Sequence, residues 1–483
     1  MGLTEFIENS FKKYLPSPFS IAVLLTLLTI ILALAFTENT SEGNHITALL
    51  TYWEDGIWNN ALLVFGYQMM LILVLGHVLV LSGPIERLIL SLVKGVRNSA
   101  NAALLVALTT MLVAFFNWGL GLIFGALLAR KVGEYAQEHN IPINYPLIGA
   151  CGYLGLMVWH GGISGSAPLK VSESGHLRGL MQGVLDPERL DALPDTISTG
   201  ETVLGGPNLI IFTVVLIAVS LTAYRLGRQT KATPIRLPKY KYTTKTSGSR
   251  TEEQSDRSKS SAAKVSDKLA KVDAPNGAER LDLSKWFAIA FGVLILVAFL
   301  VQYIPSLRSL NITPNMLNFF MFGVALVLHG SIRSFLRAVE EAIGDTAGIL
   351  IQFPLYFGIM GIMAQSGMIN GISDFFIAVS NETTLPIFMF FSAGLVNIFV
   401  PSGGGQWAIQ GPLVIESALE LGVPLGKAVM ALAYGDQVTN MLQPFWALPL
   451  LGITKLKAKE ILPYTLIFLV VATAIYILGL LIF

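Results

Sequence analysis

The sequence has 483 residues, of which 53% are hydrophobic and only 13% are charged, and its mean hydropathy is +0.64. Soluble domains carry about 25% charged residues, so this composition excludes an ordinary soluble protein and requires many segments that face lipid. The net charge of +1 gives no reason to expect a nucleic-acid partner. The single cysteine, Cys151, excludes an internal disulfide and a thiolate metal site.

The expected membrane spans are the long apolar runs. A helix needs about 20 mostly apolar residues to cross the hydrocarbon layer. The runs that meet this length are 18–36, 60–82, 203–224, 286–304, 316–332, 346–365 and 461–483. The first follows a charged N-terminus and lacks a small-residue cleavage site, which favours a retained span over a signal peptide. Two more stretches, 145–168 and 425–451, are long enough but are interrupted by Gly, Pro and polar residues. We therefore expect an all-α polytopic membrane protein with about nine transmembrane helices, two of them broken at the midplane.

Two further apolar stretches carry polar residues in their middle. Stretch 102–130 contains Asn117, and stretch 385–421 contains Asn397 followed by a Gly-rich segment at 401–406. Each arm has about 12–16 residues and reaches roughly 18–24 Å, which is too short for a full crossing. We predict two re-entrant hairpins whose tips are shielded from lipid, because bare backbone is tolerated at membrane depth only inside protein or a wet cavity.

The loop charges predict the orientation, since cytoplasmic loops are enriched in Lys and Arg. Segments 37–59 and 367–426 each have four acids and no Lys or Arg, whereas 225–285 has fifteen bases and seven acids. This alternation predicts a cytoplasmic N-terminus and an outside C-terminus in a bacterial-type cytoplasmic (inner) membrane. Segment 225–285 also has the polar composition of a flexible cytoplasmic linker between two halves, 1–224 and 286–483.

The two halves show an internal repeat. Gln68 and Gln352 each open a similar apolar helix, which is followed by a short amphipathic piece, a hairpin and a broken helix. The helix of Gln352 is the fifth predicted crossing after that of Gln68, an odd number, so the repeats are expected to be inverted. Inverted repeats with paired broken helices are typical of secondary transporters, whose substrate binds near the midplane where the repeats meet.

The breaks predict the chemistry of the binding site. Free N–H groups at helix starts favour a carboxylate, and glycines let the backbone approach a ligand closely. No Arg or Lys is available for a second carboxylate, which favours a monocarboxylate over a dicarboxylate. The candidate substrate-binding residues are Asn117, Trp118, Gly119, Gly162, Ser164, Ser166, Asn397, Ser402, Gly403, Gly404, Gly405, Gln406, Gln437, Thr439, Asn440 and Gln443.

Asp436 is the single acid in a 27-residue window that is otherwise free of charge. A buried intramembrane carboxylate is costly and usually functional, so Asp436 is expected to couple transport to Na⁺ or H⁺, with Asn117 and Asn397 as further candidates. His160 is a possible modulator, whereas a structural role is expected for His77 and His329. No cofactor and no resident metal are expected, since the histidines lack metal-ligand spacing. Without a nucleophile–base pair or a nucleotide-binding loop, the sequence favours neither an enzyme nor a primary pump.

At its polar motifs the sequence resembles the bacterial short-chain fatty acid transporter family. The segments that carry the resemblance are FFNWGLG at 115–121, GGISGS at 161–166, VPSGGGQWAIQGP at 400–412, AYGDQ at 433–437 and QPFWALP at 443–449. It covers nearly the whole chain apart from the linker and implies a carrier of acids such as butyrate and acetoacetate. The family's similarity to a wider ion-transporter superfamily implies homodimers and an elevator-type movement. Two positions depart from the family pattern, which has Gly at 160 and Glu at 436, so His160 could alter substrate preference.

The leading hypothesis is a cation-driven secondary carrier, or symporter, of short-chain monocarboxylates. A carrier of the same fold for a dicarboxylate or an amino acid is an alternative. An anion channel is another, since paired broken helices do not exclude one. A membrane enzyme finds the least support.

Overall fold

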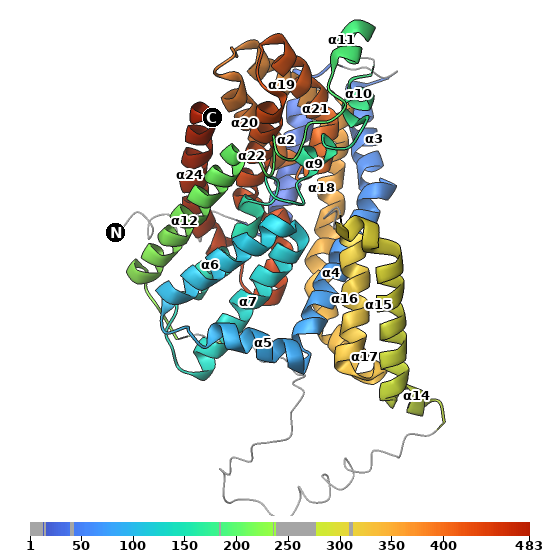
Figure 1. Cartoon of the computed structure of the whole chain (residues 1–483), viewed down its shortest axis with the longest axis vertical. Helices are drawn as coiled ribbons and strands as arrows, with labels where there is room; N and C mark the ends of the chain where they lie inside the picture. The colour runs from blue at the N-terminus through green and yellow to red at the C-terminus, as the bar shows by residue number, and fades with distance from the viewer. Residues whose placement is uncertain are drawn as a thin grey trace, which may run out of the picture.

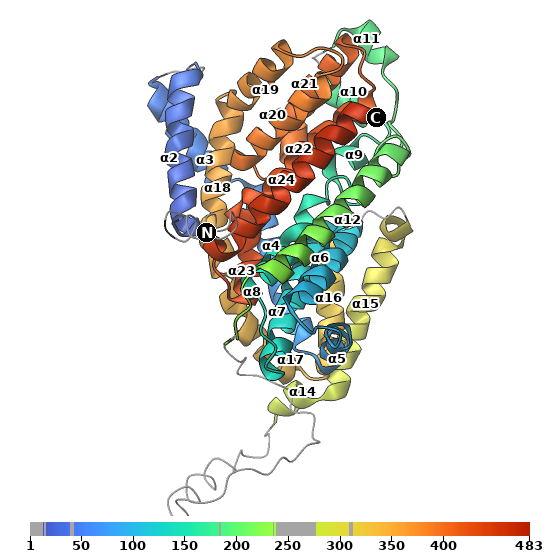
Figure 2. The ribbon, with the colours of Figure 1, turned by 90° about the vertical axis from the view of Figure 1, so that its left-hand side faces the viewer.

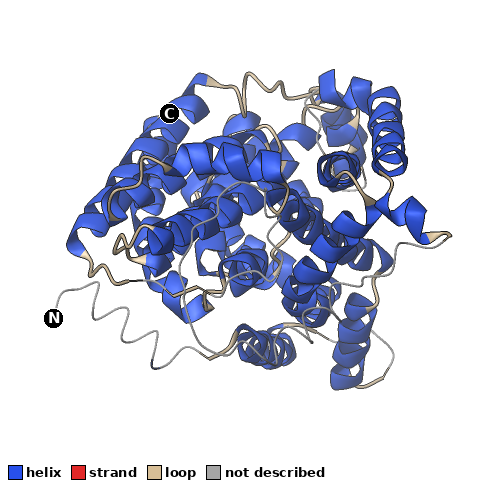
Figure 3. Cartoon of the chain, turned by 90° about the horizontal axis from the view of Figure 1, so that it is seen from below, coloured by secondary structure: helices blue, strands red, loops and turns tan. Residues whose placement is uncertain are grey.

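The computed structural model describes residue 13 and residues 16–38, 43–182, 185–234, 236–237, 277–308 and 313–483. Regular structure in these ranges is helical, as Figure 3 shows. The extended pairings there are isolated bridges at Ile143–Thr233 and Gln182–Leu185. The expected all-α class is confirmed.

Seven helices of the described ranges are long and apolar enough to cross a membrane. They are α2 (Pro18–Phe36), α4 (Asn60–Val80), α6 (Ser99–Phe116), α12 (Gly206–Gln229), Lys285–Pro305 within α15 (Lys285–Arg308), the stretch Ile332–Gln365, and α24 (Ala458–Ile482). Six of them coincide with predicted spans, and α6 is the first arm of the first predicted hairpin. The span expected at 316–332 forms a shorter helix, α16 (Pro314–His329), which ends at Gly330 with a φ of +65°. The expected total of nine crossings is reached only if shorter or interrupted helices also cross the membrane. That total stays a prediction.

One group of helices packs around α4 and α18 (Ala347–Gln365), and we call it the scaffold unit. Helices α2 and α3 (His45–Ile57) lie along α18 at one edge of the molecule (Figure 2). Helices α15, α16 and α17 (Ile332–Ala342) gather beside α4 (Figure 1). A 3-10 turn, η2 (Ile343–Thr346), joins α17 to α18.

The second group, which we call the core unit, holds both hairpins and both interrupted stretches. Its members are α6, α7 (Trp118–Glu138), α8 (Tyr145–Tyr153), η1 (Leu154–Met157), α9 (Ser166–Lys170), α12, α20 (Leu385–Phe399), α21 (Gly403–Glu420), α22 (Leu425–Thr439), η3 (Asn440–Leu442), α23 (Pro444–Thr454) and α24. Helices α5 (Gly83–Val93) and α19 (Met368–Ala378) connect the two units, and α12 lies beside α24 (Figure 2). The remaining helices are short: α10 (His176–Met181), α11 (Pro187–Ala192) and α14 (Glu279–Leu283).

Helix α3 lies in a segment that the sequence assigned to an outside loop. Asn44 caps it by accepting the Ile46 N–H at 3.0 Å. Gly56 then packs against Gly361 of α18, whose Cα lies 3.0 Å from where a Gly56 Cβ would stand. The four acids of segment 37–59 led to its assignment as a loop, because the number of charges in a segment does not indicate whether it packs against another helix.

Three of the four hairpin arms are longer than expected. Helix α6 has 18 residues and α7 has 21, while α20 has 15 and α21 has 18. At 1.5 Å per residue the arms of the first hairpin reach roughly 27 and 32 Å. The estimate of 12–16 residues holds for α20. It was wrong for the first hairpin because α6 starts at its Asn98 cap and α7 continues past Arg130 to Glu138. The length of the arms therefore no longer argues that the first hairpin enters and leaves the membrane on one side. Re-entrant hairpins stay a prediction.

The linker prediction falls largely on residues that the structure does not describe. Its first part is described: α12 runs to Gln229, Thr233 pairs with Ile143, and the Leu237 N–H donates to Gln137 Oε1 at 2.6 Å. These contacts fix the start of the linker against the end of α7. The expected flexible stretch beyond it lies outside the described residues.

Candidate functional site

The first interrupted stretch breaks at 158–165, between η1 and α9. Glycines close its turns: the Gly162 N–H donates to the Trp159 carbonyl and the Gly165 N–H to the Gly162 carbonyl, both at 3.0 Å. A Cβ on Gly165 would overlap the His160 carbonyl oxygen, so no larger residue fits there. The break is therefore a tight, ordered turn.

The two interrupted stretches, which lie far apart in the sequence, are joined by hydrogen bonds. Gln437 Oε1 accepts the N–H groups of both His160 and Gly161 at 2.9 Å. Asn440 Nδ2 donates to the Leu156 carbonyl at 3.2 Å. Side-chain amides of the second stretch thus satisfy the backbone groups that the first break frees, as buried polar groups require.

His160 and Asp436 form a buried pair at the centre of this junction. Their side chains are 0% and 1% exposed, and His160 Nδ1 is bonded to Asp436 Oδ2. The Ala167 N–H donates to His160 Nε2 at 3.1 Å. Because Nε2 accepts, the ring proton lies on Nδ1 and a neutral imidazole donates to the carboxylate. Asp436 Oδ1 is buried without a donor among the described residues, so one carboxylate oxygen remains available.

Asn397 of the second hairpin faces the same stretch. Its Nδ2 lies 2.6 Å from the Asp436 carbonyl oxygen, 3.0 Å from Thr439 Oγ1 and 2.9 Å from Asn440 Oδ1. Gln443 Nε2 donates to the Asn397 carbonyl. Asn397 Oδ1 and Gln443 Oε1 are buried without a donor in the described part of the chain. Together with Asp436 Oδ1, they make this region rich in unsatisfied oxygens, which suits a hard cation.

The start of α21 lies against the His160–Asp436 pair. A Cβ on Gly403 would stand 2.8 Å from His160 Cε1 and 3.2 Å from Asp436 Oδ2, and one on Gly404 would stand 3.8 Å from Ser166 Oγ. Ser402 Oγ accepts the Gly405 N–H at 3.2 Å. The N–H groups of Gly403 and Gly404 have no acceptor among the described residues, and Gly404 is exposed. An 18-residue helix thus presents two free donors and its positive dipole end.

Gln406 is fully buried, and its Oε1 has no donor among the described residues. Its Nε2 donates to the Ala393 carbonyl at 2.9 Å and to Gln410 Oε1 at 2.7 Å, both within the second hairpin. Gln410 Nε2 continues the network to Ser373 Oγ and Ser392 Oγ. The structure therefore gives Gln406 a role in holding the two hairpin arms together.

The first hairpin meets the first break. Asn117 Oδ1 accepts the Leu120 N–H at 2.9 Å and caps α7, and the Trp118 N–H donates to Ser164 Oγ at 2.9 Å. A Cβ on Gly162 would strike the Phe115 carbonyl, and one on Gly119 would stand 3.6 Å from Leu317 of the scaffold unit. The hydroxyl of Ser164 therefore fixes the hairpin tip.

Trp118 reaches the site through an aromatic cluster. Its ring centroid lies 6.0 Å from that of Trp159 and 5.3 Å from that of Trp446. Trp159 in turn stacks on His160 at 4.6 Å. The cluster gives the site an apolar wall.

Two residues that were not among the predicted site residues also support the site. Asn208 Nδ2 donates to the Gly161 carbonyl at 2.9 Å, and Tyr434 OH donates to Asn208 Oδ1 at 2.8 Å. The position of Asn208, a polar residue near the start of the predicted span 203–224, was the signal that could have identified it. Tyr434 lies in the AYGDQ segment at 433–437 that carries the family resemblance, but it was not selected as a site residue, because apolar helices often carry tyrosine.

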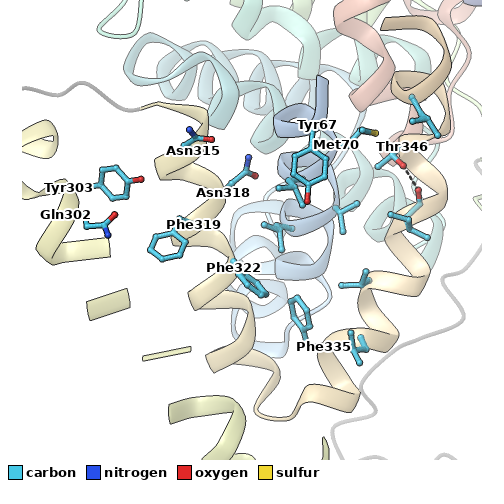
Figure 4. A pocket seen from close by; sticks show the side chains of 17 residues that line it. Tyr67, Met70, Gln302, Tyr303, Asn315, Asn318, Phe319, Phe322, Phe335 and Thr346 are labelled. Carbon is cyan, nitrogen blue, oxygen red and sulfur yellow. Dashed lines mark hydrogen bonds between the residues drawn. The ribbon is translucent and has the colours of Figure 1, made fainter. Parts of the chain in front are cut away.

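A large cavity lies elsewhere, in the scaffold unit (Figure 4). It has a volume of 830 Å³, is mostly apolar, and lies between α4 and α15 to α18. None of the predicted site residues lines it. A smaller cavity of 260 Å³ reaches the second hairpin at Val400 and Gly405 and is bordered by Asp55, Asn59 and Gln365.

The fold and this junction define a multi-pass helical membrane protein with the polar interior of a transporter. The family model described as "Short chain fatty acid transporter" matches residues 1–483, and the chain belongs to this family. A relative from Escherichia coli (strain K12) named "Putative short-chain fatty acid transporter" is 37% identical over 100% of this chain and 99% of its own length. One of the same name from Haemophilus influenzae is 35% identical over 99% and 98%.

The YdaH transporter of Alcanivorax borkumensis is 15% identical over 97% of this chain and 98% of that chain, with a TM-score of 0.42. The family model and the two curated relatives confirm the resemblance to the short-chain fatty acid transporters. Membership of a transporter family favours a non-enzyme.

Proposed function

We propose that this protein carries short-chain monocarboxylates, of the butyrate and acetoacetate type, across the cytoplasmic membrane by cation-coupled alternating access. The observation that carries the proposal is the start of α21, where two unpaired N–H groups lie beside a buried His–Asp pair. Elements of both halves contribute to this junction, as they do at the substrate sites of secondary transporters.

The carboxylate of the substrate binds the Gly403 and Gly404 N–H groups, with Ser166 Oγ as a third donor. A helix N-terminus stabilises such an anion through its N–H groups and dipole. The described residues in contact here include no Lys or Arg, which supports a single carboxylate. The substrate tail packs toward the Trp118–Trp159–Trp446 cluster.

The coupling cation binds near Asp436 Oδ1, Asn397 Oδ1 and Gln443 Oε1, three of the buried oxygens that have no donor among the described residues. His160 is a positioning residue in this proposal, since it occupies Oδ2 and turns Oδ1 toward the cation. Either Na⁺ or H⁺ satisfies a carboxylate with one vacant oxygen. Asn117, which holds the corresponding place in the first hairpin, is the second candidate region for a cation.

The surrounding architecture enters the proposal as well. We infer inverted repeats, re-entrant hairpins, a cytoplasmic N-terminus, an outside C-terminus, an inner-membrane location and a homodimer. The loop charges and the shared order of elements around Gln68 and Gln352 support the first five. The family resemblance supports the homodimer, which light scattering of the purified protein in detergent tests.

The test is uptake of labelled butyrate and acetoacetate into proteoliposomes under an imposed Na⁺ gradient or proton gradient. Asp436→Asn keeps an acceptor for His160 Nδ1 but removes the charge, so gradient-driven uptake should fall at least about tenfold, the factor that 1.4 kcal/mol of lost interaction produces. Asp374→Asn, which removes an exposed acid on α19, is the matched control and should retain wild-type uptake.

The outcomes separate the alternatives. Absence of uptake of either acid by folded wild-type protein contradicts the substrate assignment and leaves the family and fold standing. Strong competition by dicarboxylates or amino acids would favour a carrier of another solute. Conductance without saturation or counterflow would favour a channel.

A further inference from the structure

Aromatic side chains form part of the contact between the scaffold and core units. Phe65 of α4 lies 6.0 Å from Trp446 of α23, measured between ring centroids. Phe353 of α18 stacks on Phe445 of α23 at 4.0 Å and 23°. Apolar contacts of this kind are not strongly directional, so they permit packed units to shift relative to each other.

A single ion pair of the described residues crosses this boundary. Lys455 Nζ, at the end of α23 in the core unit, is paired with Asp345 Oδ1 in η2 of the scaffold unit. The other ion pairs of the described ranges lie within one unit or between neighbouring surface segments. The Lys455–Asp345 ion pair is therefore the point where opposite charges of the two units meet among the described residues.

The acid of the pair is held on the scaffold side. Asp345 is 4% exposed, and its Oδ2 lies 3.0 Å from Nδ1 of His77 on α4, which is 1% exposed. Lys455 is 38% exposed. If the pair opens, the lysine reaches water while the carboxylate keeps its histidine partner. Neither charge is then left buried and alone, which is the condition that makes broken buried pairs costly.

The backbone around Lys455 is shaped for this contact. Lys455 has a φ of +61°, a left-handed conformation at a helix end that glycine usually provides. One turn earlier, a Cβ on Gly452 would stand 2.9 Å from the Asp345 carbonyl oxygen. Glycine occupies the position where α23 must approach η2, and lysine occupies the position where glycine would suit the backbone. The lysine side chain accounts for this arrangement.

We propose that the Lys455–Asp345 ion pair is a latch that holds the core unit against the scaffold unit in this conformation. The latch opens when the core moves during the transport cycle, so it rests on the alternating access of the proposed function. Lys455, Lys457 and Lys459 place it at the cytoplasmic end by the charge rule. It governs the movement and contributes no atom to the substrate site.

The test measures the distance between the units without requiring transport. Spin labels are placed at Glu138→Cys in the core and Arg337→Cys in the scaffold, both exposed, on a Cys151→Ser background that removes the only native cysteine. Pulsed electron-paramagnetic-resonance measurements then give the distance distribution in proteoliposomes. Lys455→Gln should add a second distance population that the parent protein lacks, because the state with an open latch becomes more favourable. Lys459→Gln removes the same charge four residues later and should reproduce the parent distribution.

Butyrate uptake by the same proteins separates this proposal from the transport assignment. A changed distribution in Lys455→Gln without uptake by any variant would support the latch and contradict the substrate. Uptake by the parent, with the same single distance population in both lysine variants, would contradict the latch and leave the carrier standing.

Discussion

At the scale of the residue, the site depends on side chains that satisfy backbone groups of a distant segment. Gln437 accepts two N–H groups of the first break, and Asn208 donates to its carbonyl at Gly161. Leaving such a buried group unsatisfied costs about 1–3 kcal/mol. These residues therefore keep the broken backbone ordered, while Gly403, Gly404 and Asp436 retain groups free for a ligand.

Gly404→Ala tests the carboxylate site at this scale. The added methyl would meet nothing nearer than Ser166 Oγ at 3.8 Å, so the fold should be unaffected. The methyl would stand at the proposed carboxylate position, and KM for butyrate uptake should rise about tenfold or more, the effect of about 1.4 kcal/mol of lost binding. Gly371→Ala, which adds a methyl to open space on α19, is the control. An unchanged KM in Gly404→Ala would move the carboxylate away from the start of α21.

At the scale of the element, close helix contacts rest on facing glycines. Gly56 of α3 and Gly361 of α18 lie against each other, and a Cβ on Gly361 would overlap the Tyr52 carbonyl. In the core unit, Gly125 of α7 and Gly152 of α8 make the same kind of contact. Small residues allow this approach, and close packing drives helix association in lipid, where the hydrophobic effect does not.

Gly361→Ala should separate α3 from α18. Overpacking of this kind typically costs about 1–3 kcal/mol, so the variant should unfold at a lower temperature than wild type in the same detergent. Gly371→Ala again serves as control and should be neutral or slightly stabilising, because alanine is the better helix former. Equal melting temperatures for both variants would contradict the tight contact between α3 and α18.

At the scale of the whole molecule, the contact between the scaffold and core units includes aromatic side chains and, among the described residues, the Lys455–Asp345 ion pair. The core unit contains both hairpins and both interrupted stretches, so the proposed alternating access predicts that the substrate site moves with the core unit as a single body. Cys151 lies in α8, is fully buried within that body, and reports on its integrity.

Cys151 should resist a small maleimide in folded protein, with or without butyrate, and should react fully after denaturation in detergent. Movement of an intact core keeps the contact between α7 and α8 closed, so labelling should not depend on substrate. The rate is measured by mass spectrometry of the intact protein. Labelling that rises with butyrate would mean that the core opens internally and would contradict its movement as one body.

The sequence by itself determined the membrane class, the all-helical fold, the family and the positions where the backbone breaks. These follow from composition, run length and local Gly, Pro and Asn patterns, which act within a few turns of the chain. The sequence also indicated most polar residues of the junction, including Asp436, His160 and Asn397, because polar groups are costly in an apolar segment.

Tertiary structure alone decided which of these residues meet. The pairing of His160 with Asp436 spans 276 positions, and that of Lys455 with Asp345 spans 110. The hydrogen bonds of Gln406 within the second hairpin and the packing of α3 on α18 are also contacts that only the tertiary structure shows. Such contacts depend on how helices from both halves assemble, and local patterns of hydropathy and charge carry no information about which partner a buried polar group will find.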